Sequence, residues 1–173
     1  MTMVKTLEEL ISNADIERIS RLPNVVEKLT YLEKEENLRY LKSLEFSGEN
    51  LYPIFRSSDW KDKLDWARDN FEGVLKPMEF NGYHYSQIVR NKDWKDKLDW
   101  VSKKFDKRFN NGYRSDRYDL NNSQFSKIIK GKDWRDKLAW VLRNYDSKKH
   151  NSSDIQKALI KKDWRKEVGK FAA

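Results

Sequence analysis

One stretch of eight residues constrains the fold of this chain more than any other feature. It reads DWKDKLDW at residues 93–100, is identical at residues 59–66, and returns with two changes at residues 133–140. A shortened copy, DWRKEV, stands at residues 163–168, and all seven tryptophans of the chain lie in these copies. The fold is therefore expected to be built from copies of this repeat.

The copies align well beyond this stretch when the first tryptophan of each is taken as an anchor. Six residues before each anchor stands isoleucine or alanine, and four residues after it stands leucine or valine. The same register reaches the N-terminus, where Val25 replaces the anchor tryptophan and Tyr31 replaces the second one. Successive anchors are 35, 34, 40 and 30 residues apart, a period typical of stacked helix pairs. The five anchors are Val25, Trp60, Trp94, Trp134 and Trp164.

Apolar residues follow each anchor at the spacing of an α-helix. In the third repeat they are Trp94, Leu98, Val101 and Phe105, which form one stripe of a helix. A shorter apolar pattern precedes each anchor and predicts a short helix, and only a few residues separate the two patterns. A tight helical hairpin results. The sequence thus predicts an all-α fold, an α-solenoid-like array of about five helical hairpins that forms a single domain over residues 1–173.

An aspartate or asparagine stands immediately before each apolar stripe. We expect its side chain to cap the helix by accepting a hydrogen bond from the first turn. In the first repeat, the capped helix is expected to continue to about Leu44. The predicted caps are Asn24, Asp59, Asp93, Asp133 and Asp163.

The tryptophans are expected to form the structural core. The anchors lie on the apolar stripe, whereas the second tryptophan of each repeat lies about 120° around the helix from it. The second column is therefore expected to pack against the neighbouring repeat. The predicted core tryptophans are Trp60, Trp94, Trp134 and Trp164 as anchors and Trp66, Trp100 and Trp140 as the second column.

The charge of the chain is polarised along its length. The net charge of +8 divides into −3 for residues 1–50, zero for residues 51–100 and +11 for residues 101–173. The sequence therefore has acidic N-terminal repeats, a neutral middle and basic C-terminal repeats. Such asymmetry points to an acidic partner near the C-terminal half.

Basic residues recur at fixed offsets around every predicted hairpin turn, including three residues after the anchor at Lys28, Lys63, Lys97 and Lys137. In the second and third repeats neighbouring aspartates balance them, which favours an ordinary solvated face. In the last two repeats they outnumber the acids, and a long connector, residues 106–122, adds three arginines, two of which are candidate binding residues. The candidate residues for binding nucleic acid or an acidic partner are Lys127, Lys130, Lys132, Arg135, Lys157, Lys161, Lys162, Arg165, Arg114 and Arg117.

Signatures of catalysis are poor. The chain has two histidines, no cysteine and no glycine-rich phosphate loop, and neither histidine stands at a spacing suited to a metal site. Helix capping accounts for most of the aspartates, while Asp65 and Asp99 are expected to face solvent. The sequence predicts a protein that is not an enzyme, with no catalytic residues, no cofactor, no metal site and no evident small-molecule substrate.

Two functions remain open. The first is a non-enzymatic helical-repeat protein whose basic C-terminal edge binds the nucleic-acid backbone. The second is a protein–protein interaction module, an adaptor or inhibitor, that docks on an acidic protein surface. No signal peptide or membrane span is recognisable, so a soluble cytoplasmic protein with no membrane partner is expected.

Overall fold

The computed structural model describes residues 10–109, 122–146 and 148–171, with the side chains of 104–109 and 122 left undescribed. All described elements are helical, and the described ranges contain no β-strand. The chain divides into two compact units, residues 1–92 and 93–173, called the N-terminal unit and the C-terminal unit. The boundary falls inside the third predicted hairpin, so the single domain stays a prediction.

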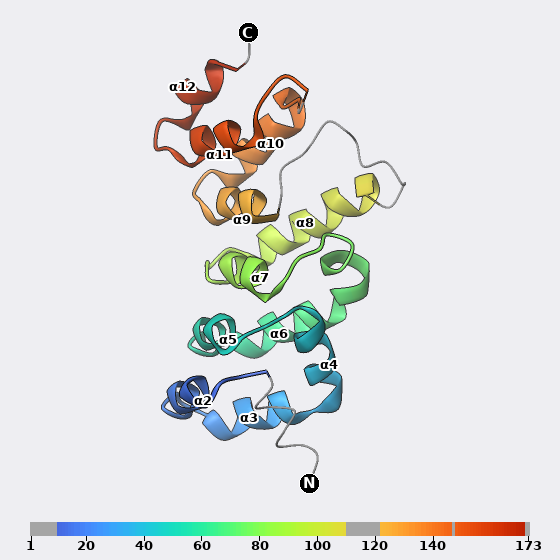
Figure 1. Ribbon diagram of the computed structural model, residues 1–173, viewed down its shortest axis with the longest axis vertical. Helices are drawn as coiled ribbons and strands as arrows, with labels where there is room; N and C mark the ends of the chain where they lie inside the picture. Colours follow the sequence, from blue (N-terminus) through green and yellow to red (C-terminus); the bar gives the residue numbers. More distant parts are fainter. Residues whose placement is uncertain (1–9, 110–121, 147, 172–173) are drawn as a thin grey trace. The chain divides into compact units, whose positions relative to one another are not determined.

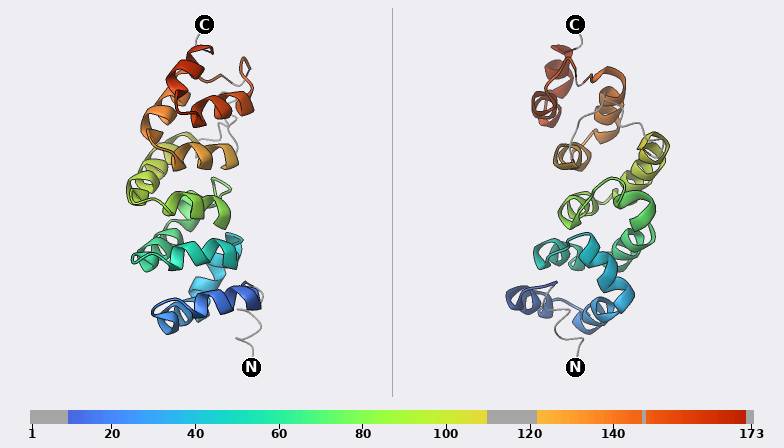
Figure 2. Two further views of the ribbon diagram at one scale, coloured as in Figure 1. Left: turned by 90° about the vertical axis from the view of Figure 1, so that its left-hand side faces the viewer. Right: turned by 45° about the vertical axis from the view of Figure 1, so that its right-hand side comes forward.

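The N-terminal unit contains six α-helices and one π-helix in its described part. Helices α2, α5 and α7 pack side by side, α4 contacts α6, and α5 contacts α6; Figures 1 and 2 show the three parallel helices at one side of this unit. The elements are α2 (Asn13–Ser20), α3 (Val25–Glu33), α4 (Glu35–Ser43), α5 (Gly48–Phe55), α6 (Trp60–Asp69), η1 (Phe71–Leu75) and α7 (Gly82–Val89).

The C-terminal unit repeats the same kind of packing. Helix α9 contacts both α10 and α11, and α11 contacts α12, so that two short helices lie side by side and each is followed by its partner (Figure 1). The elements are α8 (Trp94–Phe109), α9 (Asn122–Lys130), α10 (Trp134–Asn144), α11 (Ser152–Ile160) and α12 (Trp164–Gly169).

Each of the five anchors is the first residue of a helix, as the apolar period predicts. The anchor tryptophans are buried, together with the leucine or valine four residues later. The second tryptophans are half-buried. Trp66 of α6 stacks on Tyr85 of α7 at a centroid distance of 6.3 Å, and Trp100 of α8 meets Trp134 of α10 edge-on at 5.8 Å. These contacts join one repeat to the next within each unit.

Four of the five predicted side-chain caps are wrong, and the one at Asp93 stays a prediction. Asn24, Asp59, Asp133 and Asp163 precede the helices but accept no side-chain cap hydrogen bond. A capping residue ordinarily has extended backbone, whereas these four residues have αL or bridge-region backbone, for example φ 56° at Asp133. The side-chain caps found belong instead to the shorter first helices, at Ser12, Asn81 and Asn151.

The long helix predicted to end near Leu44 is interrupted. Lys34 has extended backbone, with φ −67° and ψ 126°, and separates α3 from α4. The side-chain amide of Asn37 donates to the backbone carbonyl of Tyr31 at 2.7 Å, so it satisfies a carbonyl freed by the break. Glu35 and Glu36 then occupy the first turn of α4, where the helix dipole favours negative charge.

The segment between α6 and α7 also contains structure. Helix α6 is followed by the π-helix η1, and Leu75, Met78 and Phe80 are buried. Gly82 then begins α7 so close to Phe46 that an added Cβ would lie 2.7 Å from the Phe46 Cα atom. The segment is thus part of the core of the N-terminal unit.

Candidate functional site

The exposed face of α9 consists of lysine. Among the residues of α9 whose side chains are described, only Lys127 and Lys130 are exposed, because the remaining positions pack inward. On the neighbouring helix α11 the exposed residues are Asp154, Lys157 and Ile160. Since α9 and α11 pack side by side, their exposed lysines lie on one surface.

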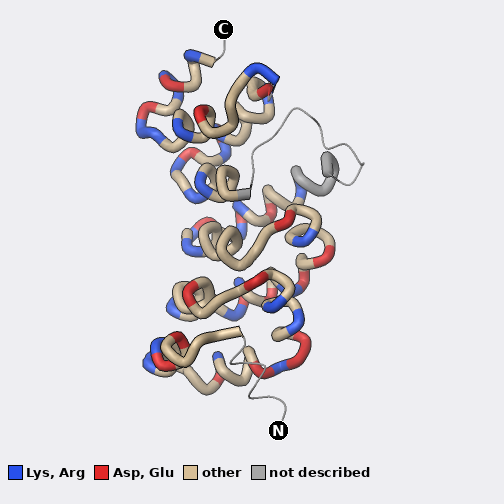
Figure 3. The backbone as a smooth tube through the Cα atoms, in the orientation of Figure 1, with Lys and Arg blue, Asp and Glu red and all other residues tan. Residues whose placement is uncertain are grey.

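The turns that follow these two helices carry more lysines. Lys132 follows α9, and Lys161 and Lys162 follow α11; all three are exposed. Figure 3 shows Lys and Arg gathered where α9 joins α10 and where α11 joins α12. We call the set formed by the two helices and their turns the lysine surface. It comprises Lys127, Lys130, Lys132, Lys157, Lys161 and Lys162.

Some members of the lysine surface have acidic neighbours. Lys157 lies 3.4 Å from Asp154, and Lys161 lies 2.9 Å from Glu167. Both lysines are more than half exposed, and surface pairs of this kind contribute about 0–1 kcal/mol. An incoming anion can therefore displace the acidic partner at little cost.

The two arginines predicted for this site have a different role. Arg135, at the start of α10, pairs with Asp96 of α8 at 3.4 Å, and Arg165, at the start of α12, pairs with Asp136 of α10 at 2.6 Å. Each arginine therefore reaches back to the aspartate at the same position of the preceding repeat. We call this pattern the Arg–Asp ladder.

Each ladder arginine also covers the anchor tryptophan beside it. The guanidinium carbon of Arg135 lies 5.2 Å from the Trp134 ring centroid, and that of Arg165 lies 4.6 Å from the Trp164 ring. Stacked guanidinium groups on indole faces form cation–π contacts. Arg135 and Arg165 thus each contact the preceding repeat and the anchor tryptophan of their own repeat.

A second link between repeats passes through Asp93. Its carboxylate accepts from Lys97 Nζ at 2.9 Å and from the indole Nε1–H of Trp134 at 3.1 Å. Partial burial alone would raise the pKa of Asp93, but the hydrogen bonds and charge of Lys97, aided by Trp134, hold the pKa below its ordinary value. Asp93 is therefore an ionised structural acceptor.

The lysines three residues after the anchors do not belong to any basic surface. They are buried, so their place in the predicted basic edge is wrong. Lys63 pairs with Asp59 at 2.7 Å and Lys97 with Asp93 at 2.9 Å, each one helical turn earlier. Lys28 instead donates to the carbonyl of Pro23 in the hairpin turn. The buried set is Lys28, Lys63, Lys97 and Lys137.

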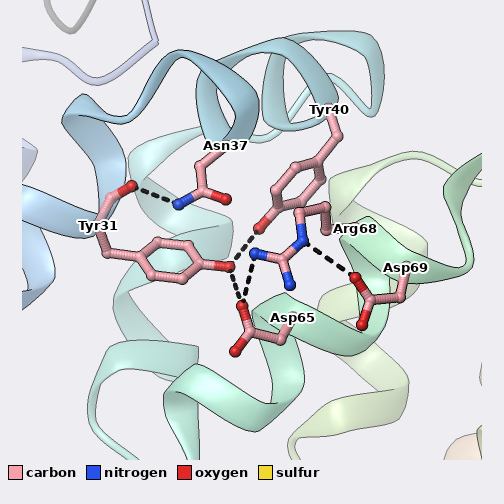
Figure 4. A network of polar contacts seen from close by, with 6 residues as sticks. All are labelled: Tyr31, Asn37, Tyr40, Asp65, Arg68 and Asp69. Atoms are coloured by element: carbon pink, nitrogen blue, oxygen red, sulfur yellow. Dashed lines mark hydrogen bonds and ion pairs between the residues drawn. The ribbon is translucent and has the colours of Figure 1, made fainter.

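A polar network joins the first two repeats in the N-terminal unit (Figure 4). The Tyr31 hydroxyl donates to Asp65 Oδ1 at 2.9 Å and lies 3.2 Å from the Tyr40 hydroxyl. Arg68 pairs with Asp65 at 3.1 Å and with Asp69 at 3.0 Å. Asp65 is therefore engaged rather than simply facing solvent, and the network ties α3 and α4 to α6.

The histidines have local structural surroundings. The His84 imidazole completes a capping box with Asn81 at the start of α7, and burial lowers the pKa of His84. The His150 ring lies between Tyr145 and Phe171. Within the described residues, no group of three or more His, Asp or Glu side chains is placed to hold a metal ion.

Arg114 and Arg117 lie outside the described residues. Sequence reasoning missed the two aspartates of the Arg–Asp ladder, Asp96 and Asp136, which it counted among the aspartates explained by helix capping. The signal was present, because arginine or lysine follows each anchor tryptophan, and aspartate follows one residue later in the second to fourth repeats.

Comparison with known proteins finds no matching protein family, no matching curated protein and no matching solved structure. In the part of the chain that the structure describes, no helix is both long enough and apolar enough to cross a bilayer.

Proposed function

We propose that this protein is a non-enzymatic helical-repeat protein that binds the nucleic-acid backbone through the lysine surface of its C-terminal unit. The observation that carries the proposal is the composition of α9, whose exposed described side chains are lysines. Their ammonium groups are suited to phosphate oxygens, and such contacts give affinity without reading bases. Its ligand implies a location inside the cell, and we propose the cytoplasm.

The proposal includes the architecture. Five hairpins, anchored on Val25, Trp60, Trp94, Trp134 and Trp164, would form an α-solenoid-like array as one domain. It is supported by the contact between α9 and α11 and, in the N-terminal unit, by the contacts of α5 with α2 and α7. Stacked repeats present the same position of each repeat along one surface. A long polyanion is the kind of ligand that such a surface suits.

Charge reversal tests the proposal. We expect K127E/K132E/K157E/K162E to lose most nucleic-acid binding while melting at the wild-type temperature, because all four side chains are exposed. The matched control reverses four exposed lysines of the N-terminal unit, K34E/K42E/K61E/K76E, and should bind far better. An equal loss of nucleic-acid affinity in both variants would mean that only net charge matters and would contradict a localised site. Arg135 and Arg165 are left unchanged because the Arg–Asp ladder needs them.

A second candidate function is docking on an acidic protein. One observation favours it: Ile160, in the midst of the lysine surface, is 52% exposed, and buried apolar anchors commonly dominate protein interfaces. The I160Q variant separates the two functions, because it removes the apolar side chain without changing the charge of the surface. It should leave nucleic-acid binding nearly unchanged, whereas a protein partner recovered after nuclease treatment and lost with I160Q would favour the second function.

A further inference from the structure

We propose that the lysine surface binds double-stranded nucleic acid through its phosphates and does not read base sequence. This inference rests on the proposed function and deepens it by assigning the ligand class and the mode of recognition. It follows from which basic side chains remain available to a ligand and from where the aromatic rings lie.

Arginine is a frequent reader of bases, because its planar fork can make two hydrogen bonds to guanine. Both arginines at the turns of the C-terminal unit are already engaged. Arg135 and Arg165 pair with Asp96 and Asp136 and cover the anchor tryptophans. Their guanidinium groups are thus held by two kinds of contact at once, an ion pair and a cation–π contact, and a ligand would have to displace both.

The side chains left for the ligand are lysines. A lysine ammonium is a compact point charge without a fixed plane, so it contacts phosphate oxygens but discriminates poorly among bases. Lys127 on α9 and Lys157 on α11 stand seven residues before their anchors, and Lys132 and Lys162 stand two residues before. Because α9 and α11 pack side by side, matching lysines lie about 10 Å apart, the usual spacing of packed helices. The surface is therefore a two-row array of positive charge.

The aromatic rings favour a duplex over a single strand. Proteins that bind single strands stack bases on exposed rings. Among the described side chains of residues 93–171, every aromatic ring is buried or half-buried, and the half-buried Trp100 is held edge-on against Trp134. The lysine surface thus offers charge without a stacking platform, which suits a ligand whose bases are already paired.

Binding of the full-length protein to four probes tests the inference. They are two duplex DNAs of equal length and unrelated sequence, a duplex RNA, and a single-stranded DNA. The wild type should bind both duplex DNAs with equal affinity and the single strand more weakly. The duplex RNA shows whether the surface also accepts A-form geometry, and binding of either duplex type agrees with the inference.

Two variants assign the roles of lysine and arginine. K127Q/K132Q/K162Q should weaken binding to both duplex DNAs alike and reduce the salt slope by about 1 per lysine. R135K/R165K keeps its charge but loses the planar fork, so its melting temperature should fall while the salt slope and the lack of sequence preference remain.

Each contrary result has its own meaning. A sequence preference that disappears in R135K/R165K, or tighter binding of the single strand, would overturn this inference while leaving nucleic-acid binding in place. Failure of the wild type to bind any probe at low salt would overturn the proposed function itself.

Discussion

The indole Nε1–H of Trp134 donates a hydrogen bond of 3.1 Å to Oδ2 of Asp93, the residue that precedes the anchor of the previous repeat. The same carboxylate accepts from the buried Lys97. One aspartate thus joins a buried lysine of its own helix to the anchor of the next repeat. Asp93 therefore connects two repeats in addition to preceding the first residue of α8.

The two anchor tryptophans of the C-terminal unit are predicted to differ in their response to phenylalanine. Trp134→Phe loses a hydrogen bond to a charged acceptor and should destabilise by about 2 kcal/mol. Trp164 Nε1 is buried without a hydrogen-bond partner, so Trp164→Phe removes an unsatisfied donor and should cost less. Chemical denaturation of both variants measures the difference, and equal losses would contradict the importance of the Asp93 bond.

Removing Asp93 should cost more than removing its lysine partner. In Asp93→Ala the ammonium of Lys97, whose side chain is 2% exposed, loses its partner. Breaking a fully buried pair costs about 3–5 kcal/mol. The 46% exposure of Asp93 lowers that cost, but the hydrogen bond from Trp134 is lost as well, so we expect about 3 kcal/mol. Lys97→Met keeps the apolar stem and should lie within about 1 kcal/mol of wild type. Unfolding free energies of the two single variants and of the double variant give the coupling energy between Asp93 and Lys97. Losses that simply add would contradict a stabilising interaction between these two residues.

The helix starts could be predicted because their signal is local. Helices α3, α6, α8, α10 and α12 begin at the anchors since the apolar period of each repeat changes there. The break at Lys34 could not be predicted in this way, because it depends on the tertiary contact between Asn37 and the Tyr31 carbonyl. The side-chain caps were misassigned because the turn backbone, rather than residue type, decides where a carboxylate points.

For the buried lysines, residue type suggested an exposed side chain, whereas the position of the residue in the helical period indicated a buried one. The third residue after the anchor lies on the same helical stripe as the anchor and the fourth and seventh residues after it. Helical periodicity, considered alone, therefore indicates that Lys97 and Lys137 point inward. Their charge suggested the opposite, because lysine is rarely buried without a partner. Asp93 supplies that partner for Lys97. The exposure of the lysines on α9, by contrast, is what the helical period predicts, because they lie outside the apolar stripe.

Gly82 should tolerate no larger side chain. A Cβ there would lie 2.7 Å from the backbone Cα of Phe46, which cannot move aside as a flexible side chain can. Gly82→Ala should therefore destabilise by about 1–3 kcal/mol through overpacking. Gly73 is a matched control, since a Cβ at that position would meet nothing within 4 Å. The melting temperature of Gly82→Ala should be well below that of Gly73→Ala. The reverse order would contradict the close approach of α7 to Phe46.

High pH should unfold the protein through its buried tyrosines. Burial raises the pKa of Tyr31, Tyr40 and Tyr85 above the ordinary value of 10.0. Above pH 10 the unfolded chain loses these protons while the folded chain keeps them, so stability is constant below that pH and falls as pH rises through it. Each group contributes up to about 1.4 kcal/mol per pH unit.

Tyr40→Phe removes one of these groups and should make the alkaline decline shallower. Tyr83→Phe, at a ring that is 48% exposed, is the control and should leave the decline unchanged. Unfolding free energies measured by denaturant at several pH values supply the slopes. A decline in Tyr40→Phe as steep as in the wild type would show that other groups cause the alkaline unfolding.

The central claim is that the lysine surface binds nucleic-acid phosphates, and the salt dependence of duplex DNA binding by the wild-type protein tests it most directly. Each phosphate contact releases counterions, so log affinity should fall linearly with log salt concentration, with a slope of about −0.9 per contact. With the six lysines of the surface engaged, the affinity should fall about a thousandfold between about 50 and 200 mM salt. Absence of binding to duplex DNA and to duplex RNA at the lower concentration, or an affinity that does not change with salt, would contradict the claim.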